Sequence, residues 1–83
     1  MQQPKIMEVF NQLKSFGLSE LDASLVADCI NHKKECSWQN NDLITSEAVE
    51  KANKYLIENK LGLIISVNPS RFDKFIWETK KIE

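Results

Sequence analysis

Residues 45–79 read TSEAVEKANKYLIENKLGLIISVNPSRFDKFIWET, and this stretch decides the expected fold. Residues 46–60 have the apolar periodicity of an amphipathic helix, with serine or threonine available as its N-cap. The apolar run 63–67 follows, and its β-branched content favours a strand. After a proline-containing turn at 68–71 comes a second apolar run around 75–77. The order helix, strand, turn, strand predicts an α+β fold.

The segment after residue 67 has two interpretations. As a hairpin, residues 63–67 pair with about 74–79, and Pro69 takes the second position of a type I turn. As a helix, Ser70 is the N-cap and apolar residues recur at helical spacing from Phe72. We favour the hairpin, because a strand over 63–67 needs a partner for its backbone groups. The alternative is an all-α chain with a C-terminal helix from Ser70.

Two further helices are predicted upstream. Residues 6–16 place their apolar side chains in one helical stripe that stops at Gly17. Ser19 caps a second helix with Asp22 as its reciprocal partner. Its expected buried face is Leu21, Leu25, Val26, Cys29 and Ile30. Only Gly17 and Leu18 join the two helices, so the helices must pack against one another. Residues 33–44 are polar in the middle and are expected to form a loop.

Composition limits the class of protein. Eighty-three residues make one small domain, residues 1–83. No window approaches the ~20 apolar residues of a membrane span, and the first residues lack a secretory pattern. Two cysteines do not make a disulfide framework. We therefore expect a cytoplasmic protein without a membrane partner.

The stretch YLIENKLGLI, residues 55–64, resembles the end of a recognition helix entering the wing of winged helix-turn-helix regulators. The similarity covers about residues 43–79. It implies three helices followed by a C-terminal β-hairpin, and a small regulator of transcription that binds double-stranded DNA by occupying a site. Both a monomer and a homodimer fit this expectation. The twelve-residue segment before the third helix departs from the family's short helix and tight turn.

The resemblance implies that the third helix enters the major groove and that the hairpin supplies a basic wing. The residues implied to contact DNA are Ser46, Lys51, Asn53, Lys54, Ser70, Arg71 and Lys74. The net charge of −1 weakens this interpretation, although residues 51–83 carry seven bases against four acids. Glu47 with Lys51, and Glu50 with Lys54, also have the i,i+4 spacing of an ordinary solvated helix.

An adaptor that binds another protein is the second hypothesis, with Trp38 and Trp77 as candidate partner contacts or buried anchors. Cys29, His32 and Cys36 are residue types that bind zinc, but a continuous helix would hold the two cysteines about 10 Å apart. No fourth ligand is close in sequence, so no metal or cofactor is expected. The sequence has no glycine-rich phosphate loop and no spaced acid–base pair, so catalytic residues and enzymatic activity are not expected.

Overall fold

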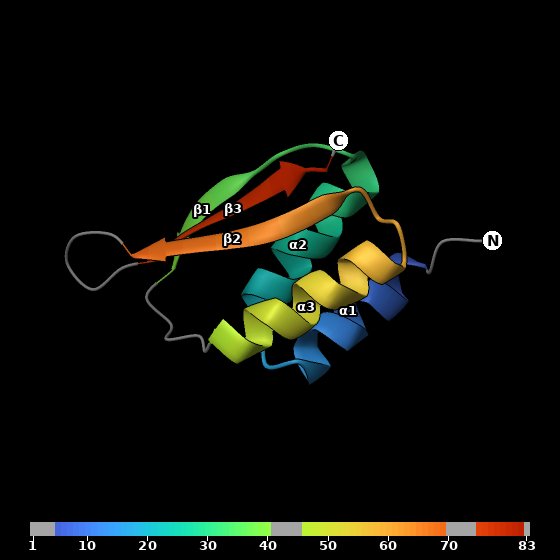
Figure 1. Cartoon of the computed structure of the whole chain (residues 1–83), viewed down its shortest axis with the longest axis horizontal. Helices are drawn as coiled ribbons and strands as arrows, with labels where there is room; N and C mark the ends of the chain where they lie inside the picture. The colour runs from blue at the N-terminus through green and yellow to red at the C-terminus, as the bar shows by residue number, and fades with distance from the viewer. Residues whose placement is uncertain (1–4, 41–45, 70–74, 83) are drawn as a thin grey trace.

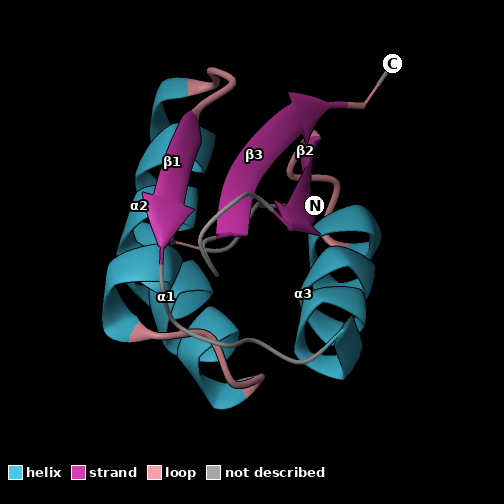
Figure 2. Ribbon diagram, turned by 90° about the vertical axis from the view of Figure 1, so that its left-hand side faces the viewer, coloured by secondary structure: helices cyan, strands magenta, loops and turns pink. Residues whose placement is uncertain are grey.

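A computed structural model describes residues 5–40, 46–69 and 75–82 of the chain. In these residues, helices lie on one face of an antiparallel sheet, as Figures 1 and 2 show. The elements in chain order are α1 (Ile6–Ser15), α2 (Glu20–His32), β1 (Ser37–Asn40), α3 (Ser46–Glu58), β2 (Leu63–Pro69) and β3 (Phe75–Lys81). The α+β class predicted from the sequence is confirmed.

The predicted ends of α1 and α2 are present. Gly17 follows α1 with φ +114°, a left-handed conformation that costs glycine little. At the start of α2, the backbone N–H of Asp22 donates to Ser19 Oγ over 3.2 Å. Ser19 Oγ in turn donates to Asp22 Oδ2 over 2.7 Å. This reciprocal pair fixes the start of α2, and the short join before it brings α1 and α2 into contact.

The sheet has the order β1-β3-β2, with both pairings antiparallel. β1 comes from residues 37–40, which the sequence predicted to be a loop, so that prediction is wrong. The expectation of a C-terminal hairpin alone is corrected in the same way, because β3 pairs with β1 as well as with β2. The helical alternative also fails, because residues 75–81 are a strand. The strand wins there because β3 has ladder partners on both sides.

The hairpin is longer than predicted. Asn68 pairs with Ile76, and Pro69 pairs with Phe75. Both residues were expected in a type I turn, but β2 continues through them. The remainder of the predicted turn, with Ser70 as the proposed cap of a helix, lies outside the described residues.

The core lies between the sheet and the helices. Its largest member is Trp77 on β3, which is fully buried. From α2, Val26, Cys29 and Ile30 are buried as predicted. Leu21 is 58% exposed, so its predicted burial is wrong. The inward face of α2 is rotated toward the small residues Ala23 and Ala27, which are buried instead.

Candidate nucleic-acid interface

The outward face of α3 is the surface for which the sequence analysis predicted contacts with DNA. Ala48, Ala52 and Leu56 are buried against the body of the protein. The opposite side is exposed and carries Glu47, Glu50, Lys51, Lys54, Ile57 and Glu58. Three acids and two bases leave this face nearly neutral, which gives little attraction for a phosphate backbone.

The two lysines of this face differ in their surroundings. Lys51 Nζ lies 3.3 Å from Glu47 Oε1, and both side chains are mostly exposed. An exposed i,i+4 pair of this kind contributes only a few tenths of a kcal/mol. A phosphate can therefore replace Glu47 as the partner of Lys51 at small cost. Lys54, one turn closer to the start of β2, is exposed on the same side.

Asn53 does not belong to the outward face. Its Oδ1 accepts a hydrogen bond from the backbone N–H of Ile65 over 2.7 Å. Its Nδ2 donates to the backbone oxygen of Ile65 over 2.9 Å. The placement of Asn53 on the outward side was wrong, because the side chain faces β2 and both ends of its amide are occupied. It fastens α3 to the strand and is not free to read bases.

The remaining predicted contacts lie outside what the structure describes. α3 begins at Ser46, whose side chain is not described. The wing residues Ser70, Arg71 and Lys74 fall in residues 70–74, between the two strands of the hairpin. The structure therefore brings Lys51 and Lys54 together on α3 and says nothing of their distance from the wing residues.

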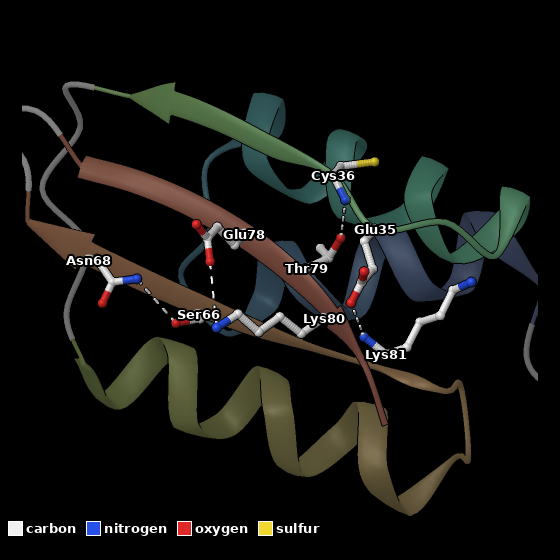
Figure 3. Close-up of polar contacts among 8 residues, drawn as sticks. All are labelled: Glu35, Cys36, Ser66, Asn68, Glu78, Thr79, Lys80 and Lys81. Carbon is white, nitrogen blue, oxygen red and sulfur yellow. Dashed lines mark hydrogen bonds and ion pairs between the residues drawn. The ribbon is translucent and has the colours of Figure 1, made fainter. Parts of the chain in front are cut away.

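The outer face of the sheet is polar where it can be followed in Figure 3. Asn68 Nδ2 donates to Ser66 Oγ over 3.4 Å on β2. Lys80 Nζ lies 3.7 Å from Glu78 Oε2 on β3. At the end of the strand, the backbone N–H of Lys81 donates to Glu35 Oε2 over 3.0 Å. The charges of this face are mixed, so it adds no basic stripe to the hairpin.

The two tryptophans are structural anchors. Their rings stack with centroids 5.7 Å apart and planes inclined by 16°. Trp38 Nε1 donates to Asp22 Oδ1 over 3.0 Å, which links β1 to the start of α2. Trp77 is fully buried, so the prediction that it contacts a partner is wrong for the folded chain. Trp38 is half-buried and keeps a partly accessible ring.

The three residues of zinc-binding types, Cys29, His32 and Cys36, contact other groups of the protein. A disulfide bond joins Cys29 to Cys36. The expected helical separation does not apply, because α2 ends at His32 and the chain turns back toward β1. His32 Nε2 lies 3.2 Å from Asp28 Oδ1 at the exposed end of α2. Nothing in the sequence signals this bond, because Lys33, where the chain turns, is not a typical helix-stop residue.

Tyr55 on α3 contacts the end of α1. Its ring contacts that of Phe16, with centroids 5.7 Å apart. Burial raises the pKa of the Tyr55 phenol above its usual value, and the negative charge of Glu8 raises this pKa further. The phenol therefore stays neutral at physiological pH and serves the contact between helices.

No protein-family model, curated protein or solved structure matches this chain. Among the described helices, none is long and apolar enough to cross a membrane.

Proposed function

We propose that this protein is a small winged-helix-like regulator that binds double-stranded DNA and acts by occupying its site. The observation that carries the proposal is the joint presentation of α3 and the β2–β3 hairpin. α3 directly precedes β2 in the chain, and the two hydrogen bonds between Asn53 and Ile65 hold them together. In Figure 1 the hairpin extends past the body beside α3. This is the order of recognition helix and wing.

The dimensions of α3 support the proposal. Its thirteen residues span about 20 Å at ~1.5 Å per residue. The major groove of B-DNA is about 12 Å wide and admits one helix. Because Ala48, Ala52 and Leu56 are buried against the body of the protein, the charged side of α3 faces outward. Lys51 and Lys54 would then contact phosphates, while Arg71 and Lys74 would act from the hairpin.

A salt-dependent titration tests the proposal. The full chain is titrated against a mixed-sequence duplex at 50 mM and 200 mM salt, together with Lys51→Ala/Lys54→Ala and Arg71→Ala/Lys74→Ala double variants. If each lost lysine removes one phosphate contact, the salt slope of the first variant falls by about 2. Lys33→Ala/Lys34→Ala is the matched control, because it removes the same charge at the end of α2, where Lys33 lies near Leu63 at the start of β2.

The outcomes separate the hypotheses clearly. Binding that weakens with salt, that both interface variants reduce and that the control keeps supports the DNA-binding regulator. Equal losses in all three double variants point to attraction by net charge alone. Absence of binding at 50 mM salt contradicts the proposal.

A protein-binding adaptor is the second candidate, and a groove between α1 and α2 favours it. The groove has a volume of about 340 Å³ and is lined by Ile6, Met7, Phe10, Ser24, Leu25, Ala27 and Asp28. Met7 is 69% exposed there. The mixed charges on the exposed face of α3 are also compatible with a protein partner. If the Lys51→Ala/Lys54→Ala variant keeps the biological activity of the natural protein, the adaptor is favoured.

A further inference from the structure

The Cys29–Cys36 disulfide ties α2 to the segment that leads into β1. Cys29 lies in the last turns of α2, and Cys36 directly precedes β1. β1 is an edge strand of only four residues, paired with β3 on one side. Short edge strands contribute few ladder hydrogen bonds and detach readily. A covalent link at this point therefore acts on one of the least secured strands of the sheet.

Hydrogen bonds around Cys36 continue the sheet beyond β1. The backbone N–H of Cys36 donates to Thr79 Oγ1 over 2.8 Å, as Figure 3 shows. The backbone N–H of Thr79 donates to the backbone oxygen of Cys36 over 2.9 Å. Thr79 is buried, so its hydroxyl depends on partners of this kind. By holding Cys36 against α2, the disulfide keeps this part of the chain in register with β3.

The two sulfur-bearing residues differ in accessibility. Cys29 is 2% exposed, whereas Cys36 is half-buried. Cys36 also borders a surface hollow of about 330 Å³, lined by Glu35, Ser37, Glu78, Thr79 and Lys80. Thiol–disulfide exchange requires an attacking sulfur to reach one sulfur of the bond. Cys36 is the more exposed of the two residues and therefore the easier one for an attacking sulfur to approach.

We propose that Cys29 and Cys36 form a redox site that takes a dithiol as its reductant and that reversibly releases β1. A thiolate of the reductant bonds to Cys36 Sγ, and the Cys29–Cys36 bond breaks, so Cys29 leaves as a thiolate and takes up a proton. The second sulfur of the reductant then attacks the mixed disulfide, and Cys36 leaves and takes up a proton. Two electrons pass to the protein, and the reductant becomes a disulfide. Reduction frees the start of β1, while the Trp38–Asp22 hydrogen bond still holds its middle.

Hydrogen exchange of the full chain tests this proposal, with dithiothreitol as the reductant. Thiol counting under denaturing conditions first gives the oxidation state of the purified protein. Peptides covering residues 36–40 are then compared between oxidised and reduced protein, with α1 peptides as the internal control. We expect exchange in 36–40 to accelerate at least about tenfold on reduction and to return after reoxidation, while α1 is unchanged.

A Cys29→Ser/Cys36→Ser variant is the matched control and should exchange at the reduced rate with or without dithiothreitol. If this variant does not fold, native protein that is reduced and then alkylated takes its place. Two free thiols in protein equilibrated with oxidised glutathione would overturn the proposal. Unchanged exchange in 36–40 after reduction would also overturn it. The inference does not depend on DNA binding, so the duplex titration and this experiment can fail independently.

Discussion

At the scale of single residues, the helix ends show how much one position matters. Lys33 after α2 and Lys60 after α3 have φ values of 53° and 54°, in the left-handed region that glycine usually fills. The backbone N–H of Lys33 donates to the oxygen of Ile30, and that of Lys34 donates to the oxygen of Cys29. These two hydrogen bonds form a Schellman motif. α1 ends with the same pattern of hydrogen bonds at Gly17, and glycine takes the left-handed conformation there at little cost.

We predict that Lys33→Gly stabilises the protein. A non-glycine residue in the left-handed conformation costs about 1–2 kcal/mol, and glycine recovers most of this after its greater entropy in the unfolded chain is subtracted. Lys33→Ala is the control, since it removes the same charge and keeps the strained conformation. Urea unfolding should place the glycine variant about 1 kcal/mol above the alanine variant. Equal stabilities would mean that the turn relaxes without cost.

Contacts between residues close in sequence could be predicted, whereas contacts between residues far apart in sequence could not. Ser19 and Asp22 were predicted as a capping pair because they stand three positions apart in the sequence. The same carboxylate accepts a hydrogen bond from Trp38, sixteen residues away, and no periodicity signals that contact. The left-handed conformation of Lys33 was not predicted either, because lysine is not a residue type that indicates a helix end.

At the scale of elements, β1 was missed because its sequence carries no strand signal of its own. Ser37, Gln39 and Asn40 have low β-propensity, and four residues are too few to display an alternation. The strand exists because β3, about forty residues later, supplies its backbone partners. β2 has the β-branched composition that predicts a strand, and it was found.

The contact between α3 and β2 leads to a second prediction, on Asn53. Asn53→Ala leaves the backbone N–H and oxygen of buried Ile65 without these partners. The expected loss of unfolding free energy is about 2 kcal/mol, measured by urea denaturation. Asn53→Asp should lose at least as much, because a carboxylate cannot donate to the Ile65 oxygen.

Asn59→Ala is the matched control for Asn53. Asn59 directly follows α3, and its Nδ2 donates one hydrogen bond to the backbone oxygen of Tyr55 in α3 over 2.9 Å. Its removal should cost under about 1 kcal/mol, because the helix end can be solvated. If the two alanine variants lose the same free energy, the bridge from Asn53 does not fasten α3 to β2.

At the scale of the whole molecule, the two edges of the sheet are secured by different means. At β2, the Asn53 amide occupies the backbone of Ile65 and α3 lies alongside. At β1, two fasteners tie the strand to α2: the disulfide at Cys36 and the hydrogen bond from Trp38 to Asp22. The sequence predicted the helices and the hairpin, and it placed Lys51 and Lys54 outward. It could not predict how the edges are secured, since both devices join residues through the tertiary fold.

The two fasteners on β1 act on one strand, so we predict that their losses are not additive. Trp38→Phe keeps an aromatic ring against Trp77 but removes the donor to the buried Asp22 carboxylate, which should cost about 2 kcal/mol in the oxidised protein. In reduced protein the same substitution should cost less by 0.5 kcal/mol or more, on the order of couplings between residues of one network. Because reduction frees the start of β1, the Trp38–Asp22 hydrogen bond is formed in a smaller share of the folded molecules, and its removal costs less. Urea unfolding followed by circular dichroism, with and without dithiothreitol, gives all four free energies, and Asn59→Ala should cost the same in both conditions. Equal costs of Trp38→Phe in the two redox states would show that the disulfide and Trp38 secure separate parts of the fold.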